Sequence, residues 1–384
     1  MRRTKVALVL EATQGGTRRH VMDLIDGLSP NRFDVLPVVS PRHEGEFLPD
    51  LERMWTEGRR VAVIPMRREP SPLCDLVALY RMCRLLLRER PDVVHAHGSK
   101  GGLLGRLAAR ITGVGAVYHT PHVYPFQWAR GGMKRVLFLA VERLLWRLST
   151  KVVAVGRGQA EVALKMRVAR GDRLVTIPNG VDTGRFEKLS TPECRAGVRR
   201  ELGLTDEQVA VGMVARLSPQ KGCGHFVRAA KAVSERHPNA RFLLIGAGPL
   251  LPDLHALAEE LGIRDRVAFM GHRPDADRLY AGLDLFVLSS LWEGLPYVLL
   301  EAQASGLPVI ASRIPGCEEL VENGATGFLV ELCNEQEICE RICGLISSPE
   351  KRREMGERGR QNVRDGFRLD RFLEMHAELY EGRL

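Results

Sequence analysis

The sequence predicts an α/β protein built from two doubly wound parallel sheets. Short apolar runs without alternation recur along the whole chain, as in strands that are buried on both faces. Amphipathic stretches of helical period separate most of these runs, which is the pattern of βαβ units. The chain has 384 residues, and at roughly 150 residues per domain this length indicates two domains.

The composition narrows the class of partner. Hydrophobic residues make up 45% of the chain and charged residues 27%, which is ordinary for a globular protein. The eight cysteines include no Cys-x-x-Cys pair, so we expect free thiols in a reducing cytoplasm and no zinc ribbon. A net charge of +9 favours anionic partners, such as a nucleotide diphosphate or an acidic membrane. We find no nucleic-acid-binding module and expect no nucleic acid partner.

The first half of the chain supplies one set of strands and helices. The opening apolar run is short and ends at Glu11, so we interpret it as a first strand and not as a signal peptide. The predicted strands are residues 6–10, 35–39, 61–64, 93–95, 116–119, 152–155 and 174–177. The helical stretches between them include residues 21–28, 73–88 and 133–148.

The second half repeats this alternation after a predicted linker. Residues 181–205 are polar and contain Pro192 and Gly197, so we expect an irregular connection there. The strands that follow are predicted at residues 209–214, 241–245, 266–269, 285–288, 308–311 and 327–330. Helices are expected at residues 225–233 and 254–261, and again in the charged tail after residue 349.

Two carboxylates, Glu293 and Glu301, give the most informative motif. Glu293 follows the predicted strand 285–288, and the carboxyl ends of strands are where open α/β sheets bind ligands. Gly294 and Leu295 lead into a helix whose free N–H groups suit a phosphate. We expect Glu301 near the same face, because eight residues are a little over two turns at about 3.6 residues per turn.

Two further loops carry groups that suit a phosphate. Gly15 and Gly16 follow the first strand, where glycine lets backbone approach a phosphate closely. Arg216 follows the strand 209–214, and Lys221 opens the next helix. A lysine is unfavourable at a helix N-terminus unless an anion joins it, so we expect both cations to stabilise a diphosphate leaving group.

Two other loops are expected to line the site. His119 and His122 lie around a proline turn after the strand 116–119, where a histidine can bond a sugar hydroxyl. Gly246 and Gly248 imitate the start of a dinucleotide-binding fingerprint. The third glycine position holds Leu251, so we do not expect NAD to bind.

Taken in their order along the chain, from Gly15 to Glu301, the motifs resemble those of the retaining glycosyltransferases of family 4 (group 1), which have the GT-B fold. Bacterial exopolysaccharide and capsule transferases are similar. The resemblance implies two facing Rossmann-like domains: an acceptor-side domain at 1–185, a donor domain at 186–365, and a C-terminal helix, 366–384, that packs back toward the first domain. It further implies binding of the nucleotide sugar by the residues Gly15, Gly16, Gly246, Gly248, Gly294, Leu295 and Glu301.

The resemblance assigns catalytic positions to His119, Glu293, Arg216 and Lys221. Glu293 would contact the donor sugar and Glu301 the ribose. On the acceptor side, weaker candidates are His97, Ser99, Lys100 and His122. No Asp-x-Asp pair flanks the predicted donor loops, so we expect no bound metal and no cofactor besides the UDP-, GDP- or ADP-sugar substrate. Front-face transfer and double displacement both remain open.

We therefore predict an enzyme that transfers a sugar from a nucleotide sugar to a glycan or lipid-linked acceptor in polysaccharide synthesis. Alternatives are a nucleotide-sugar epimerase of the same shape and a non-catalytic nucleotide-sugar-binding protein. Residues 132–147 combine basic and apolar side chains, which fits either a helix on an anionic membrane or a core helix with a basic solvent face. The expected location is the cytoplasm, with peripheral binding to the inner face of the plasma membrane as an option.

Overall fold

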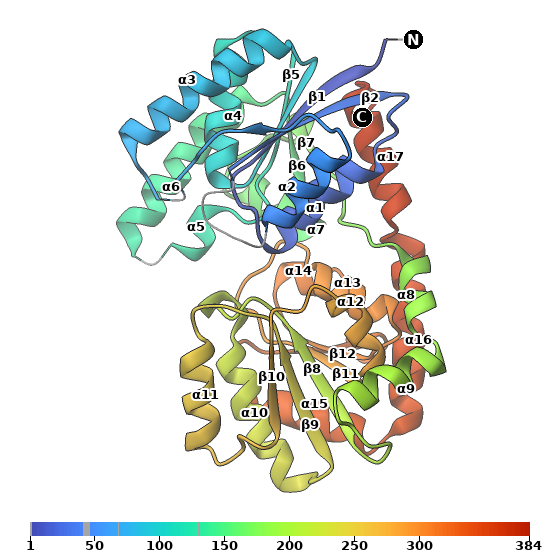
Figure 1. Cartoon of the computed structure of the whole chain (residues 1–384). Helices are drawn as coiled ribbons and strands as arrows, with labels where there is room; N and C mark the ends of the chain where they lie inside the picture. Colours follow the sequence, from blue (N-terminus) through green and yellow to red (C-terminus); the bar gives the residue numbers. More distant parts are fainter. Residues whose placement is uncertain (1, 41–46, 68, 130) are drawn as a thin grey trace. The chain divides into compact units, whose positions relative to one another are not determined.

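The chain folds into two units, each built around one parallel sheet. The computed structural model describes residues 2–40, 47–67, 69–129 and 131–384. The first unit is Met1–Asn179 together with Asp370–Leu384, and the second is Gly180–Leu369 (Figure 1). Paired strands run parallel in both sheets, so the predicted α/β class with two doubly wound sheets is confirmed.

The first sheet has seven strands in the order β3-β2-β1-β4-β5-β6-β7. The chain runs outward from β1 to β3 and then continues on the other side of β1, so the order reverses between β1 and β4. The side chains of β4 are all buried, which explains why this run does not alternate. The strands are β1 (Thr4–Leu10), β2 (Phe33–Val39), β3 (Ala62–Val63), β4 (Val93–His97), β5 (Ala116–Thr120), β6 (Lys151–Ala154) and β7 (Leu174–Thr176).

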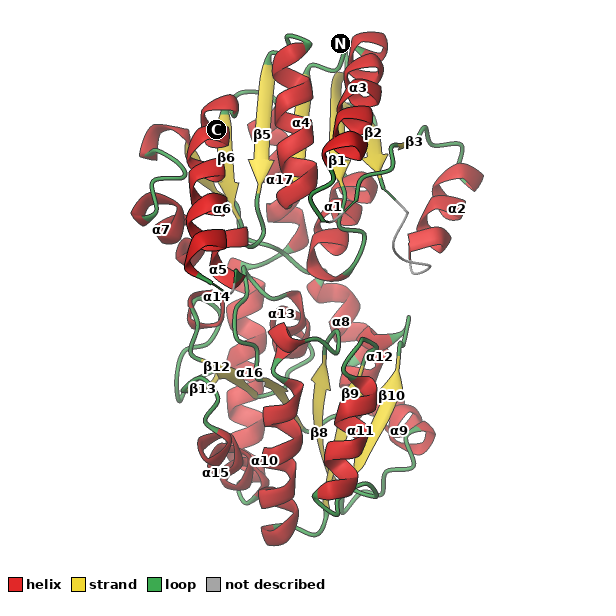
Figure 2. Ribbon diagram, turned by 90° about the vertical axis from the view of Figure 1, so that its left-hand side faces the viewer, coloured by secondary structure: helices red, strands yellow, loops and turns green. Residues whose placement is uncertain are grey.

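Helices cover both faces of the first sheet. Figure 2 shows α4 between α3 and α6 on one face. On the other face, α1 packs against α17 through Gly27 and Leu373. The helices of this unit are α1 (Gly15–Gly27), α2 (Leu48–Thr56), α3 (Pro72–Glu89), α4 (Ser99–Ile111), α5 (Pro125–Trp128), α6 (Gly132–Leu145), α7 (Arg157–Lys165) and α17 (Leu369–Tyr380).

A buried ion pair joins α4 to α6. Arg106 on α4 is fully buried, and its guanidinium lies 3.2 Å and 3.4 Å from the two carboxylate oxygens of Glu142 on α6. The Arg106 Nε–H also donates to the carbonyl oxygen of Gly102 at 2.7 Å. Glu142, which interrupts an apolar stretch of the sequence, therefore points inward and neutralises a buried cation.

The last helix, α17, packs within the first unit. The ring of Phe372 lies 4.8 Å from that of His20 on α1. The Tyr380 hydroxyl lies 2.7 Å from His95 Nδ1 on β4, and the Tyr118 hydroxyl on β5 donates to the carbonyl oxygen of Leu379 at 2.9 Å. The C-terminal helix therefore completes the core of the first unit, although the residues that precede it belong to the second.

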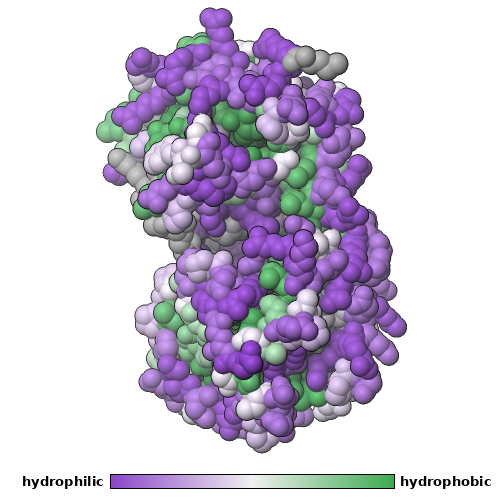
Figure 3. Space-filling model, turned by 45° about the vertical axis from the view of Figure 1, so that its right-hand side comes forward, coloured by the Kyte–Doolittle hydropathy of each residue, from purple (hydrophilic) through white to green (hydrophobic). Residues whose placement is uncertain are grey.

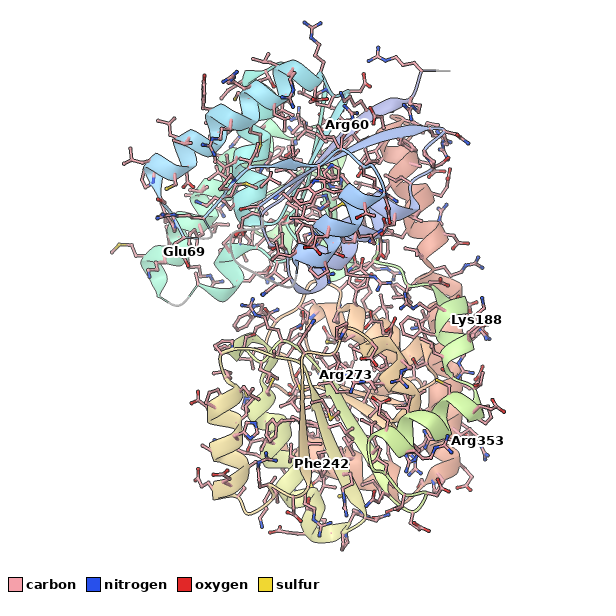
Figure 4. All side chains as sticks on the ribbon, in the orientation of Figure 1. Arg60, Glu69, Lys188, Phe242, Arg273 and Arg353 are labelled. Carbon is pink, nitrogen blue, oxygen red and sulfur yellow. The ribbon has the colours of Figure 1, made fainter. Side chains whose placement is uncertain are left out.

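The second sheet has six strands in the order β10-β9-β8-β11-β12-β13. Phe242 on β9 (labelled in Figure 4) is fully buried and packs against Phe226 at a ring distance of 5.8 Å. All thirteen strands expected from the sequence overlap strands of the structure. Those of this sheet are β8 (Val209–Val214), β9 (Ala240–Ile245), β10 (Val267–Gly271), β11 (Leu285–Leu288), β12 (Val309–Ser312) and β13 (Gly327–Val330).

The predicted irregular linker at residues 181–205 is wrong, because helices α8 and α9 form there. Asp182 caps α8 by accepting from the Arg185 N–H at 3.1 Å, and Thr191 caps α9 by accepting from the Cys194 N–H at 3.2 Å. Pro192 is the first residue of α9, where its missing N–H costs nothing. Two polar residues of this stretch, Asp182 and Thr191, are therefore helix caps, while Pro192 and Gly197 lie within α9.

The remaining helices complete the second unit. They are α8 (Thr183–Leu189), α9 (Pro192–Glu201), α10 (Cys223–Arg236), α11 (Leu251–Glu260), α12 (Ala276–Leu279), α13 (Tyr297–Ala304), α14 (Pro315–Glu318), α15 (Glu335–Ile346) and α16 (Pro349–Gly366). Within the described ranges, no helix has both the length and the apolar character needed to cross a lipid bilayer. The face drawn in Figure 3 is mostly hydrophilic, with smaller hydrophobic areas between the polar side chains.

Candidate active site

The loops after β8, β9 and β11 lie at the carboxyl end of the second sheet. β8 lies between β9 and β11, and the strand order reverses there, which is the position where open α/β sheets bind ligands. Arg216 follows β8 by two residues, and Lys221 ends the 3-10 turn Pro219–Lys221. Arg216 is exposed, and its side chain has no hydrogen bond or ion pair with another described residue. Its guanidinium is therefore available for an anion.

Lys221 is paired with Glu293. The Lys221 Nζ lies 2.5 Å from Glu293 Oε1, and the Ser290 hydroxyl donates to the same oxygen at 2.7 Å. The two charged side chains are only 18% and 8% exposed. The anion that we expected beside Lys221 is thus present within the chain. Because an ammonium has three N–H donors, Lys221 can hold Glu293 and a phosphate oxygen at the same time.

Glycines allow the loops of this site to pack closely. Gly222 has a φ of +60°, and a Cβ on it would collide with the carbonyl oxygen of Ser289. Gly246 has a φ of +141°, and a Cβ there would collide with the carbonyl oxygen of Ala215 in the β8 loop. A Cβ on Gly248 would likewise collide with that of Leu217. Close packing against the β8 loop is therefore enough to explain the glycines at positions 246 and 248, independently of any bound nucleotide.

The expected two-turn helical spacing between Glu293 and Glu301 is wrong. α13 begins at Tyr297, so only Glu301 lies on the helix. Gly294 and the buried Leu295 form a turn before it, and the Gly294 carbonyl packs against Gly316 at the start of α14. Glu301 Oε2 accepts a hydrogen bond from the Tyr280 hydroxyl at 3.0 Å. The two carboxylates are therefore held by different partners.

One Asp-x-Asp pair does occur in the sequence, at Asp275 and Asp277. Asp275 pairs with Arg273 (labelled in Figure 4) at 2.8 Å and with Arg278 at 3.2 Å. The hydrogen bond from Arg273 lowers the pKa of Asp275 well below its usual range. Asp277 pairs with Arg185. Arginines therefore already neutralise both carboxylates of this pair.

In the first unit, His119 and His122 have different surroundings. His119 is buried on β5, and its Nε2 bonds the carbonyl oxygen of Gly98 at 3.1 Å. His122 follows the strand with a φ of +58°, a strained conformation for a residue other than glycine. The Gln159 side-chain amide donates to the His122 carbonyl at 2.5 Å and holds this loop. Such strain is often found at functional positions, which favours His122 as the residue that meets a substrate.

A cluster of six histidines surrounds this loop, and the sequence predicted only part of it. Ring contacts join His20 on α1, His97 at the end of β4, His122 and His376 on α17. His95 packs on His97, and His119 lies on the neighbouring strand. Burial lowers the pKa of His20 to about 4 and that of His376 to about 3, and it lowers the pKa values of the other four. The six imidazoles are therefore neutral at physiological pH.

The other candidates of the first unit lie at the starts of two helices. Gly15 and Gly16 are exposed in the first turn of α1, and Gly15 has a φ of +59°. Ser99 is exposed at the start of α4. Lys100 is buried, and its ammonium donates to Asp75 on α3 at 2.6 Å. Lys100 therefore connects two helices, whereas Ser99 is open to solvent.

Comparison with known families finds a match in each half of the chain. Residues 195–362 match the family described as glycosyl transferases group 1. Residues 14–185 match the family described as glycosyltransferase family 4. The first match covers the loops that carry Arg216, Lys221, Glu293 and Glu301.

Individual proteins are similar over most of their length. The chain is 32% identical to an Escherichia coli protein named UDP-Gal:alpha-D-GlcNAc-diphosphoundecaprenol alpha-1,3-galactosyltransferase, over 82% of this chain and 81% of that protein. It is 28% identical to a capsular polysaccharide biosynthesis glycosyltransferase of Staphylococcus aureus, over 79% and 80% of the two chains. Among solved structures, an Anabaena protein in complex with UDP and glucose matches at 22% identity with a TM-score of 0.84, covering 99% and 100% of the chains.

Proposed function

Because the chain belongs to the group 1 glycosyltransferases, with a family 4 first half, we propose that it transfers a sugar with retention of anomeric configuration and without a metal. The donor is a nucleotide diphosphate sugar. The observation that carries this proposal is the Lys221–Glu293 pair beside the exposed Arg216 at the switch point of the second sheet.

The second unit supplies the groups that stabilise the leaving diphosphate. As the bond between the anomeric carbon and the diphosphate oxygen breaks, negative charge grows on the diphosphate. Arg216 and Lys221 neutralise that charge, and preorganised cations are effective because they need not reorient. Glu293, held by Lys221 and Ser290, orients the donor sugar. Glu301 holds the ribose, and the loop with Gly246 and Gly248 lies beside the nucleotide.

No metal is needed in this scheme, because the two cations do the work that a divalent ion does in other transferases. The carboxylates of Asp275 and Asp277, the only Asp-x-Asp pair, are occupied by arginines. Between His119 and His122 of the first unit, we assign the sugar contact to His122, because the His119 ring is bonded to the carbonyl oxygen of Gly98, just after β4.

The acceptor we propose is a sugar carried on a lipid diphosphate, by analogy with the Escherichia coli relative. Two helices of the first unit fit such a substrate. On α6, Met133, Val136, Leu137 and Leu144 are 87%, 66%, 59% and 66% exposed. The buried side of α6 is formed by Glu142 and Leu145 instead. This arrangement favours a membrane-facing helix over a core helix with a basic solvent face, because apolar side chains are exposed among the cations.

The α3 helix presents a second apolar face. Its exposed side chains are Leu73, Leu76, Val77 and Tyr80, at 81%, 64%, 49% and 62%. Ion pairs from α4 hold both α3 and α6 (Figure 2). Exposed cations flank both faces: Arg81, Arg84 and Arg88 on α3, and Lys134 and Arg135 on α6. Apolar side chains flanked by cations fit the surface of an anionic membrane. We therefore place the enzyme at the inner face of the plasma membrane.

Placing acidic residues on the exposed apolar side of α6 tests this membrane contact. We expect the wild-type chain to float with vesicles that contain phosphatidylglycerol. In the presence of neutral vesicles it should remain unbound in the bottom fraction. The double variant Leu137→Glu with Leu144→Glu should lose most of this binding, because two apolar anchors are replaced by anions. Leu332→Glu, at a 47% exposed leucine of the second unit, is the matched control. Equal flotation of all three proteins, or no preference for anionic lipid, would rule out the contact.

A transfer assay tests the proposed reaction. The chain is incubated with UDP-, GDP- and ADP-sugars, with and without a lipid-diphosphate-linked sugar, and the products are followed by mass spectrometry. We expect transfer from one donor class, undiminished by EDTA, with Arg216→Ala lowering kcat by about 10²- to 10³-fold. Arg353→Ala, at an exposed arginine of α16 (labelled in Figure 4), is the control.

Three results would contradict the proposal. Interconversion of the donor sugar without any acceptor would indicate an epimerase. Donor binding without turnover on a broad acceptor panel would indicate a non-catalytic binding protein. An Arg216→Ala variant that retains full activity would show that Arg216 has no role in the reaction.

A further inference from the structure

Three histidines of the first unit bring their ring nitrogens together. They come from distant parts of the sequence: His20 from α1, His97 from the end of β4, and His122 from the loop after β5. One ring nitrogen of each lies within 4.8 Å of those of the other two. His20 and His97 are fully buried, and His122 is 9% exposed. Of these three described histidines, only His122 has any solvent exposure.

The hydrogen bonds leave nitrogens of this group without partners. His20 Nδ1 lies 2.9 Å from Asn179 Oδ1. An amide oxygen only accepts, so Nδ1 carries the hydrogen and Nε2 carries a lone pair. That Nε2 is buried without a partner. His97 Nε2 is also without a partner, but His97 faces His122 through its Nδ1, so of the two unpartnered nitrogens only that of His20 serves as a ligand atom here. A buried lone pair left without a partner is unfavourable, so His20 Nε2 favours a bound group.

The spacing of two of the rings matches a tetrahedral metal site. His97 Nδ1 and His122 Nε2 are 3.4 Å apart, which is long for a hydrogen bond. Two nitrogens bound to zinc at about 2.0–2.1 Å with tetrahedral angles lie ~3.3 Å apart. A shift of roughly 1.5 Å would bring a nitrogen at the 4.8 Å limit to the same spacing.

We propose that His20, His97 and His122 bind one zinc-class divalent cation, with a fourth position left for water. Three neutral imidazoles suit Zn²⁺, whereas Mg²⁺ and Ca²⁺ require oxygen ligands. The bond from His20 Nδ1 to Asn179 is the kind of outer contact that orients a metal-bound histidine. One corollary rests on the proposed function: a cation on His122 occupies the ring assigned to the donor sugar, so Zn²⁺ inhibits an enzyme that is active without it.

Direct metal binding tests the site. The full chain, stripped with EDTA and exchanged into buffer, is titrated with ZnCl₂ against a chromophoric chelator. We expect one ion per chain, and Co²⁺ in its place should give the visible absorption of a tetrahedral site. His20→Gln, His97→Gln or His122→Gln should each weaken binding more than about 100-fold, and Asn179→Ala about 10- to 100-fold. His272→Gln, at an exposed histidine of the second unit, should bind as the wild type does.

Thermal unfolding of each metal-free variant shows whether it is folded, so that lost binding is not confused with lost structure. Absence of stoichiometric Zn²⁺ binding by the wild-type chain would overturn the proposal. Binding that survives in the folded His20→Gln and His97→Gln variants would also overturn it. If Zn²⁺ binds but does not inhibit transfer, the metal site stands and the role assigned to His122 in catalysis fails.

Discussion

Replacing Lys221 with alanine should lower kcat by about 10²- to 10³-fold, the cost of removing one preorganised donor from a developing negative charge. The structure gives two reasons for an effect of this size. Lys221 is one of two cations at the switch point where the diphosphate is proposed to leave. Its ammonium also holds Glu293, whose side chain is 8% exposed and would keep a nearly buried charge without this partner.

Steady-state kinetics and a matched control make this prediction specific. The effect should fall on kcat more than on KM, because the charge that Lys221 stabilises grows only as the bond breaks. Lys188→Ala, at an exposed lysine of α8 (labelled in Figure 4), should leave both constants unchanged. A Lys221→Ala enzyme that is folded and retains kcat within threefold of the wild type would contradict the proposed mechanism.

Replacing Glu142 with alanine should destabilise the first unit by about 3–5 kcal/mol, because it leaves a buried cation without its partner. Arg106 is fully buried, and its NH1 already has no hydrogen-bond partner. The carboxylate of Glu142 is its counter-ion, at 3.2 Å and 3.4 Å. Urea unfolding followed by circular dichroism measures the loss.

Two further variants separate the buried charge from a general effect on the helix. Glu161→Ala, at an exposed glutamate of α7, should change stability by less than about 0.5 kcal/mol. Replacing both partners with apolar residues, Arg106→Met with Glu142→Leu, should recover most of the stability, because no buried charge remains. A loss below 1 kcal/mol in Glu142→Ala would show that Arg106 is hydrated or paired in another way.

Much of the fold could be predicted because local sequence patterns decide it. Each buried strand is a short apolar run. Between these runs, apolar residues recur with the period of an α-helix. The helices α8 and α9 were missed because their capping residues, Asp182 and Thr191, also favour turns. The helical spacing from Glu293 to Glu301 is wrong because the chain between Glu293 and the start of α13 at Tyr297 is a turn, so a helical period does not apply to it.

The site was harder to predict where it depends on contacts between distant residues. Arg216, Lys221 and Glu293 follow strands that are neighbours in the sheet, so strand order alone indicates that they lie together. The histidine cluster has no such signal, because α1 and α17 bring His20 and His376 to it from opposite ends of the chain. Likewise, Glu142 lies on the buried side of α6 because it pairs with Arg106, which lies 36 residues earlier in the chain. This long-range pair decides which side of α6 is exposed.

The central claim is that the strand-end loops of the second unit bind the nucleotide diphosphate through Arg216 and Lys221. Calorimetric titration with UDP, GDP and ADP tests it most directly. We expect one of them to bind the wild-type chain at one site. The double variant Arg216→Ala with Lys221→Ala should bind it at least about 100-fold more weakly, since each charge-assisted hydrogen bond contributes about 1.5–3 kcal/mol. Equal affinity of the folded double variant would show that the nucleotide binds elsewhere and that these two cations do not hold it.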